Sequence, residues 1–318
     1  MLEQFKKDVM EGLSAKPKRL PSKYFYDQRG DELFVQIMHL PEYYLTRAEH
    51  EIFREQTENI IQELGISPEK HFELIELGAG DGTKTKELLA KLTANGFSYD
   101  YLPIDISQNA LNGLKDSLAI ELPDVCCRPK QGDYFEVLES LKNGKHQKIV
   151  LFLGSNIGNL SDERAADFMN ELGKTLNPDD ILFLGVDIIK DESIVLPAYN
   201  DSAGVTRAFN LNLLERINRE LDANFNIENF EHAPEYTVES GVAKSFLKSL
   251  ENQSVYIRSI DREFHFEKGE KIHTEVSRKY NDEIIEKITE NAPLEISSKL
   301  SDSNNYFTDY ILRISNHF

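Results

Sequence analysis

The sequence has little of what disulfide-stabilised, fibrous or membrane-spanning proteins require. Its 318 residues include two cysteines, no tryptophan, 17 glycines and 11 prolines. Cys126 and Cys127 are adjacent and adjacent cysteines rarely pair, so we expect no disulfide framework and a reducing compartment. No apolar run approaches the roughly 18 residues of a membrane helix. The segment 1–13 mixes charged and apolar residues, which predicts an amphipathic helix and not a signal peptide. We therefore expect a cytoplasmic protein.

Positive charge is also scarce. Lys and Arg number 36 against 55 Asp and Glu, which gives a net charge of −19. This balance argues against a general nucleic-acid binder and against an anionic membrane surface, because both need clustered basic residues. Hydrophobic residues at 40% and charged residues at 29% are typical of a globular protein with a sizeable core. The length suits one large domain or two intertwined ones, and we expect a monomer acting on a small molecule.

Apolar segments alternate with helical patterns through the first two thirds of the chain. This rhythm predicts right-handed β-α-β crossovers and a mostly parallel sheet with helices on both faces, an α/β fold of Rossmann-like type. The last two predicted strands are almost continuously apolar, as expected of strands covered on both faces. The predicted strands cover residues 72–77, 101–105, 125–131 (the weakest pattern), 148–154 and 181–187.

The rhythm breaks after residue 190. Residues 191–245 are polar and largely helical in pattern, with 208–221 as the best helix, and alternation typical of antiparallel strands begins near residue 254. The C-terminal stretch is predicted to return strands to the main sheet. We therefore expect one domain of residues 67–190 and 286–318, and a second, α+β domain of residues 1–66 and 191–285.

A glycine-rich turn follows the first predicted strand. Gly78-Ala79-Gly80-Asp81-Gly82 is placed where a backbone approaches a ligand and a helix N-terminus favours negative charge. Asp105 ends the next strand, where an acid accepts hydrogen bonds from ribose hydroxyls. Dinucleotides and S-adenosylmethionine are both bound in this way, although Thr83 replaces the third glycine of the dinucleotide fingerprint. A purely structural turn is the alternative.

Two further strand ends carry suitable groups. Asp133 and Tyr134 follow Gly132, and an acid beside an aromatic ring suits an adenine; a solvated loop is the alternative. Gly154 to Leu160 follows the fourth strand, and Asn159 there offers both an amide donor and an acceptor; a capped turn is the alternative. All of these groups lie at the edge where open α/β sheets bind ligands.

Several longer strings resemble one family. The chain is similar over nearly its whole length to the histidine-specific, S-adenosylmethionine-dependent Nα-methyltransferases of ergothioneine biosynthesis. The resemblance implies a class I methyltransferase domain and a second domain that recognises the substrate. Its motifs are PSKYFYD at 21–27, LPEYYLTR at 40–47, ELGAG at 76–80, FLGSNIGNL at 152–160, AYNDSAGVT at 198–206 and TEVS at 274–277.

The resemblance also implies roles for individual residues. Asn159 and Tyr26 are the expected catalytic residues: Asn159 orients the amine, and Tyr26 lies near both ligands. No metal is expected. The residues implied for S-adenosylmethionine are Gly78, Lys84, Asp105, Asp133 and Tyr134, and those implied for the amino-acid substrate are Tyr43, Asn159, Tyr199, Glu275, Val276 and Ser277.

The chemistry of these side chains agrees with the implied roles. A carboxylate such as Glu275 accepts from an imidazole N–H, and Ser277 lies two residues away, on the same face of a strand. Without the resemblance, both would be interpreted as the solvated face of a strand, and Tyr43 and Tyr199 as ordinary half-buried tyrosines. His232, His265 and His273 have no metal-like spacing and receive no role.

The expected reaction is methyl transfer from S-adenosylmethionine to the α-amine of L-histidine, up to the trimethylated betaine. One departure concerns specificity: Ser245 stands where many family members carry a Met that borders the imidazole pocket. The same chemistry on another histidine derivative or amino acid therefore stays open. A nicotinamide-dependent oxidoreductase and a cofactor-binding protein without activity are the rival interpretations.

Overall fold

The structure, a computed structural model, describes residues 2–105, 107–132, 134–142 and 144–315. Within this part the chain forms two compact units, one of Met1–Tyr44 with Lys190–Ser277, and one of Leu45–Ile189 with Arg278–Phe318. We call them the small unit and the sheet unit. No helix in the described ranges is long and apolar enough to cross a membrane.

The sheet unit alternates strands with helices. Its strands are β1 (Phe72–Leu77), β2 (Tyr99–Asp105), β3 (Lys130–Gln131), β4 (Gln147–Phe152), β5 (Ile181–Asp187), β11 (Leu294–Ser301) and β12 (Phe307–Ile314). Its helices are α3 (Leu45–Glu55), α4 (Thr57–Leu64), α5 (Thr83–Ala94), α6 (Gln108–Glu121), α7 (Tyr134–Leu141), α8 (Asp162–Thr175) and α11 (Asp282–Thr289), with the 3-10 turn η2 (Asn156–Asn159).

The described strands of this unit form one sheet in the order β11-β12-β5-β4-β1-β2-β3. The five strands from β1 to β5 run parallel, and β12 pairs antiparallel with both β5 and β11. Parallel pairing places the carboxyl ends of β1, β2 and β4 at one edge of the sheet, because Leu77 pairs with Ile104 and Glu76 with Leu151. The loops that follow these strands therefore share that edge.

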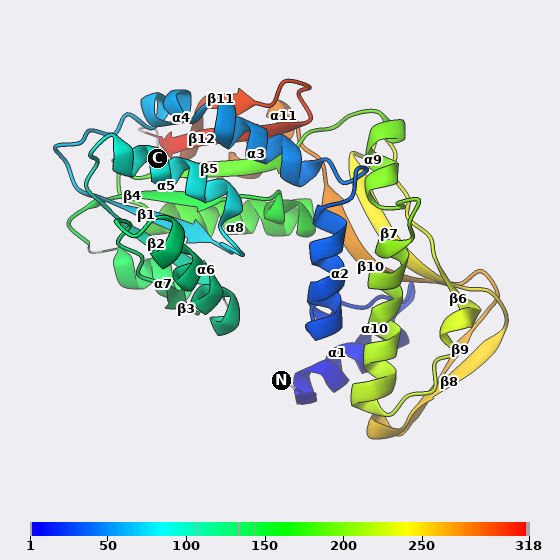
Figure 1. Cartoon of the computed structure of the whole chain (residues 1–318). Helices are drawn as coiled ribbons and strands as arrows, with labels where there is room; N and C mark the ends of the chain where they lie inside the picture. The colour runs from blue at the N-terminus through cyan, green and yellow to red at the C-terminus, as the bar shows by residue number, and fades with distance from the viewer. Residues whose placement is uncertain (1, 106, 133, 143, 316–318) are drawn as a thin grey trace. The chain divides into compact units, whose positions relative to one another are not determined.

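Both faces of the sheet are covered (Figure 1). Alternate residues of β1 enter different cores: Leu74 packs with side chains of α3, α4 and α5, whereas Ile75 packs with side chains of α7, α8 and α11. Burial on both faces explains why β5 is buried at all seven positions. This arrangement confirms the predicted α/β fold with a mostly parallel sheet and helices on both faces.

The small unit is α+β. Its helices are α1 (Leu2–Ser14), α2 (Gln28–Met38), α9 (Glu192–Ala198) and α10 (Val205–Leu221), with short 3-10 turns at Ser22–Phe25 (η1), Ile227–Asn229 (η3) and Arg258–Ile260 (η4). Its strands are β6 (Phe230–His232), β7 (Val242–Ser249), β8 (Gln253–Ile257), β9 (Arg262–Phe266) and β10 (Lys271–Arg278). In the described chain, β10, β7 and β6 form one sheet in that order, and β8 pairs with β9.

The compact units differ from the expected division at residues 45–66, 190 and 278–285. Helices α3 and α4 belong to the sheet unit because Ile52, Phe53 and Ile60 are fully buried in the core beside β1. The chain from Arg278 also belongs to it, and Tyr280 is 1% exposed in the core on the other face. The role of the small unit in substrate recognition stays a proposal.

Candidate functional site

The loop after β1 brings its backbone close to a side chain of α7. Gly78, Gly80 and Gly82 all have positive φ, of 71°, 56° and 67°, which glycine adopts at little cost. A Cβ on Gly78 would lie 2.8 Å from the Tyr134 hydroxyl, so this position has no room for a side chain. A Cβ on Gly80 would meet nothing within 4 Å. The loop is thus tight at Gly78 and open at Gly80.

Asp105 ends β2 beside this loop. The Gly78 amide donates to the Ile104 carbonyl at 2.8 Å, which fixes the two strand ends next to each other. Asp105 is partly exposed, and its Oδ1 accepts from the Ser107 amide at 2.8 Å. Gly132, which follows β3, donates to the Asp105 carbonyl. The structure therefore brings Gly78, Asp105 and Tyr134 to the carboxyl edge of the sheet. Asp133, predicted to bind the cofactor, lies outside the described residues.

Lys84 lies in the first turn of α5 and forms an ion pair with Glu49 of α3. Glu49 is fully buried and also accepts from the Gly154 amide, at 2.9 Å to Oε1 and 3.1 Å to Oε2. Burial acts to lower the pKa of Lys84, but the Glu49 carboxylate outweighs it and the pKa is raised. Lys84 is therefore an ammonium at neutral pH. Its partner Glu49 was not among the predicted site residues.

The loop after β4 adds two asparagines. Asn159 ends η2 and is exposed, and among the described residues its side-chain amide has no hydrogen-bond partner. Asn156, which was not predicted, places its Nδ2 3.6 Å from a Cβ built on Gly78 and 3.7 Å from one on Gly154. It therefore lies between the loops that follow β1 and β4. A polar residue two positions after Gly154 in the FLGSNIGNL string was a signal that the sequence analysis did not use.

This edge suits the chemistry of S-adenosylmethionine. A ribose offers hydroxyl donors that the Asp105 carboxylate accepts, and a carboxylate of the amino-acid end is attracted to the Lys84 ammonium. The open space at Gly80 leaves the backbone accessible. The described residues present here thus fit the group, with Gly78, Lys84, Asp105 and Tyr134 as those that would hold it.

In the small unit, β10 carries the predicted imidazole-binding residues. Glu275 and Ser277 are two positions apart, so their side chains lie on the same face of β10, and Val276 lies on the other. The Tyr199 hydroxyl donates to Ser277 Oγ at 2.8 Å, and both residues are buried. Ser245 of β7 is 1% exposed and donates a long hydrogen bond of 3.4 Å to Glu275 Oε2. These contacts form two hydrogen-bonded pairs, Tyr199 with Ser277 and Ser245 with Glu275, which we together call the polar group.

Aromatic rings gather in the same unit. Tyr26 packs edge-to-face against Phe34 and Phe209, with ring centroids 5.6 and 5.7 Å away, and Phe34 contacts Tyr43 at 6.4 Å. Desolvation, then the Glu275 and Asp31 carboxylates, raise the pKa of Tyr26, so its hydroxyl keeps its proton. Tyr26 and Tyr43 were predicted site residues, whereas Phe34 and Phe209 were not.

Two of the family motifs are tied to each other by Glu42. Its Oε1 accepts from the Ser202 hydroxyl at 2.8 Å and from the Ser202 amide at 3.2 Å. Tyr43 is the next residue along one segment, and Tyr199 lies three residues before Ser202 on the other. The contact therefore links the segments that carry two predicted substrate-binding tyrosines.

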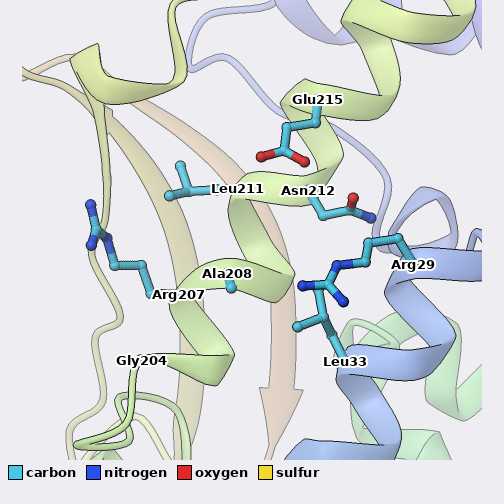
Figure 2. Close-up of a pocket in the computed structure, with 8 residues that line it drawn as sticks. All are labelled: Arg29, Leu33, Gly204, Arg207, Ala208, Leu211, Asn212 and Glu215. Carbon is cyan, nitrogen blue, oxygen red and sulfur yellow. The ribbon is translucent and has the colours of Figure 1, made fainter.

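A cavity of about 240 Å³ lies between α2 and α10, apart from these groups (Figure 2). Among its lining residues, Asn212 is 1% exposed and donates from Nδ2 to Asp27 Oδ1 at 2.8 Å. Asp27 in turn caps α2 by accepting from the Gly30 amide. No predicted residue is among the described residues that line this cavity. We therefore assign it to helix packing and not to the chemistry.

Comparison with known proteins places the chain in a family. Residues 5–314 match the model of the family described as "Histidine-specific methyltransferase, SAM-dependent". The histidine N-alpha-methyltransferase of Mycolicibacterium smegmatis is 38% identical over 283 residues, which cover 89% of this chain and 86% of that protein. The protein of the same name from Mycobacterium tuberculosis is 36% identical over 280 residues, or 88% and 85% of the two chains.

The fold has a solved counterpart. A S-adenosylmethionine-dependent methyltransferase from Clostridium acetobutylicum matches 90% of this chain and 99% of its own, with a TM-score of 0.50 and 13% identity. At that identity the likeness concerns the fold alone. The family follows from the sequence match over almost the entire length: the chain belongs to the histidine-specific, S-adenosylmethionine-dependent methyltransferases.

Proposed function

We propose that this chain transfers methyl groups from S-adenosylmethionine to the α-amine of L-histidine, three times, to give Nα,Nα,Nα-trimethylhistidine (hercynine), as in ergothioneine biosynthesis. Membership of the family supports the reaction. The observation that carries the choice of substrate is the polar group on β10, in which a carboxylate and a hydroxyl lie side by side on one strand face. The cytoplasmic location and the monomeric state expected from the sequence belong to this proposal.

The polar group matches a neutral imidazole. That ring has one N–H donor and one nitrogen acceptor. In the proposal, Glu275 accepts from the N–H, and the Ser277 hydroxyl donates to the other nitrogen. The hydrogen bond from Tyr199 to Ser277 Oγ supports this division, because it occupies an acceptor site of Ser277 and orients the Ser277 proton elsewhere. The hydrogen bond from Ser245 limits the rotation of the Glu275 carboxylate.

Methyl transfer requires an amine with a free lone pair held in line with the reacting carbon. S-adenosylmethionine supplies an electrophilic methyl group when bound. We assign Asn159 to the amino-acid end of the substrate, because its amide offers a donor for a carboxylate and an acceptor for an ammonium. Tyr26 is assigned a place near both ligands. Neither is a base, since an amide does not titrate and the raised pKa of Tyr26 keeps its hydroxyl protonated.

Mass spectrometry of an amino-acid panel incubated with the protein and S-adenosylmethionine tests the proposal. We expect histidine to gain three methyl groups in sequence, monomethyl- and dimethylhistidine to be accepted, and the trimethylated product to be inert. Fragmentation should place every methyl on the α-nitrogen. A stall at the monomethyl species, or methylation of a ring nitrogen, would contradict the proposal.

A second candidate substrate is a larger histidine derivative. Ser245 favours it, because a small hydroxyl side chain replaces the longer Met that many family members carry at this position. Including ring-substituted histidines in the same panel decides between the two. A derivative that outcompetes histidine would make the derivative the substrate, whereas a preference for histidine would leave the first proposal standing.

A further inference from the structure

Two carboxyls of the sheet unit meet at one point in its interior. A Cβ on Gly185 of β5 would lie 2.2 Å from Glu49 Oε1 and 2.8 Å from Asp309 Oδ1, so only glycine leaves both acids room. Glu49 comes from α3 and Asp309 from β12, and both are fully buried. Two ionised carboxylates at this separation would repel each other strongly where no water screens them.

The two acids differ in their partners. Glu49 has the Lys84 ammonium and the Gly154 amide, both of which stabilise a carboxylate. Neither oxygen of Asp309 has a hydrogen-bond partner among the described residues. An ionised carboxylate without donors is very costly to bury, and a protonated one costs much less. The negative charge therefore resides on Glu49 and the proton on Asp309.

The other charged groups agree with this division. Burial and then Glu49 raise the pKa of Asp309 well above its ordinary value; Lys84 opposes them, and Asp302 adds to them. The carboxylates that face Lys84 from the elements around it are Glu49, Glu76 of β1 and Asp309. Lys84 is thus held among acids, and Glu49 is the one that forms its ion pair.

The ion pair reaches the carboxyl edge of the sheet. Lys84 Nζ lies 3.7 Å from a Cβ built on Gly154, and Gly154 is exposed. The backbone amide of the same glycine donates to Glu49. One buried carboxylate therefore fixes both the position of the ammonium and the start of the loop that leads to Asn159.

We propose that Glu49 is a positioning residue of the cofactor site: it holds the Lys84 ammonium in place to receive the carboxylate of the cofactor and fixes the start of the β4 loop at the Gly154 amide, while Asp309 carries a proton. The inference rests on the proposed function, because it takes Lys84 as a cofactor-binding residue. It goes beyond that function by assigning a task to two buried acids that contact neither ligand.

The test is binding of S-adenosylhomocysteine, measured by titration calorimetry from pH 7 to pH 9.5. Glu49→Gln keeps the shape of the side chain and removes its charge. We expect dissociation constants at least tenfold above wild type at pH 7, with the ratio to wild type widening as pH rises, because Lys84 without its carboxylate loses its proton more readily. A purely structural role for Glu49 would not produce a pH-dependent ratio.

Asp180→Asn is the matched control. Asp180 and Lys148 form a second buried ion pair of the sheet unit, at 2.7 Å and 0–1% exposure, near the amino end of β4. The substitution also replaces a buried carboxylate with its amide and should lower the melting temperature. We expect its affinity for S-adenosylhomocysteine to stay within twofold of wild type at every pH.

Three results would overturn the inference: Glu49→Gln within twofold of wild type across the pH range, a constant ratio to wild type, or an equal loss in Asp180→Asn. If Glu49→Gln does not fold, Glu49→Asp replaces it in the test, because it keeps the charge but shortens the side chain by one methylene. An affinity of Glu49→Asp for S-adenosylhomocysteine equal to that of wild type also overturns the inference. A wild type that does not bind S-adenosylhomocysteine contradicts the proposed function instead.

The proton on Asp309 has its own readout. Infrared difference spectra of wild type minus Asp309→Asn at pH 8 should contain the carbonyl band of a protonated carboxylic acid. A carboxylate band in its place would show that Asp309 is ionised, which overturns the assignment of the proton.

Discussion

The Tyr199 hydroxyl donates a hydrogen bond of 2.8 Å to Ser277 Oγ, and the two residues are 78 positions apart in the sequence. Tyr199 is 8% exposed and Ser277 is 7% exposed. The bond joins the segment after α9 to β10, two of the segments in which the chain resembles its family. It also sets the direction of the hydroxyl that we assign to the imidazole ring.

Tyr199→Phe should therefore weaken histidine binding. A neutral hydrogen bond contributes roughly 0.5–1.5 kcal/mol, so we expect the KM for histidine to rise roughly two- to tenfold. The affinity for S-adenosylhomocysteine should not change. Steady-state kinetics with calorimetry of the cofactor product separate the two effects.

Tyr24→Phe serves as the control for this change. Tyr24 is a buried tyrosine of the same unit, and its hydroxyl donates to Asp8 at 2.7 Å. Because its acceptor is a carboxylate, its loss should cost at least as much stability as that of Tyr199. If both variants raise the KM for histidine equally, Tyr199 acts on the fold and not on the substrate.

Glu275→Ala should change which amino acids are methylated. A hydrogen bond to a charged group contributes roughly 1.5–3 kcal/mol, so kcat/KM for histidine should fall by roughly 10- to 100-fold. Phenylalanine, which cannot use the carboxylate, should lose much less, so the gap between the two substrates narrows. Glu263 is an acid on β9 with an exposed side chain. Glu263→Ala removes the same charge and should change kcat/KM for neither histidine nor phenylalanine. Equal losses for both amino acids would remove Glu275 from the ring-binding site.

Ser245→Met tests the departure from the family pattern. Ser245 is almost fully buried, so the longer side chain should destabilise the small unit by roughly 1–3 kcal/mol. We expect the preference for histidine to be kept or sharpened, as judged from rates on the substrate panel. Loss of activity on a ring-substituted histidine with normal activity on histidine would show that Ser245 contacts the larger substrate. Rates identical to wild type on every substrate would place Ser245 outside the pocket.

Much of the sheet unit could be predicted from the sequence because its strands are covered on both faces. The fifth predicted strand has the bounds observed for β5, since six apolar or small residues in a row, 181–186, are typical of a strand buried on both faces. Strand β7 was missed for the opposite reason. Its buried positions include Ala243, Ser245 and Ser249. Because these side chains are small or polar, the sequence of β7 does not alternate between hydrophobic and polar residues, although burial does.

The sequence did not allow prediction of site residues whose hydrogen-bond partners lie far along the chain. Glu49 bonds Gly154, 105 residues away, and no local pattern reports such a contact. A signal was nevertheless present: Glu49 falls on the buried stripe of α3 with Leu45, Ala48 and Ile52, where a charge needs a partner. Gly78 and Asp105 could be predicted without the resemblance, because ligands bind at the carboxyl ends of strands in open α/β sheets. The roles of the substrate-binding residues came from the resemblance.

Asp105→Asn should weaken binding of the cofactor and leave binding of the amino-acid substrate unchanged. If Asp105 accepts from the ribose hydroxyls, the loss of charge costs roughly 1.5–3 kcal/mol of binding to S-adenosylhomocysteine. The bond from the Ser107 amide survives, because an amide oxygen still accepts it. Asp116→Asn, on the exposed face of α6, controls for the change in net charge. Affinity equal to wild type in a folded Asp105→Asn variant would remove Asp105 from the site.

A buried acid beneath the same loop should make stability depend on pH. Glu76 of β1 is 3% exposed and accepts from the hydroxyls of Thr85, at 2.8 Å, and Tyr101. Burial raises the pKa of Glu76 to about 7, although both hydroxyls and Lys84 act to lower it. In the unfolded chain the same group titrates near its ordinary pKa of about 4.3.

Between about pH 4.5 and pH 7 the folded protein therefore holds a proton on Glu76 that the unfolded chain has released. The unfolded state binds fewer protons there, so the free energy of unfolding falls as pH rises, by up to about 1.4 kcal/mol per unit and about 3 kcal/mol in all. Glu76→Gln removes this titration. Urea unfolding from pH 5 to pH 8 should show wild type losing about 3 kcal/mol relative to the variant. Glu136→Gln, an exposed acid of α7, should follow wild type throughout. Parallel curves for wild type and Glu76→Gln would mean that Glu76 is already ionised in the folded protein at pH 5.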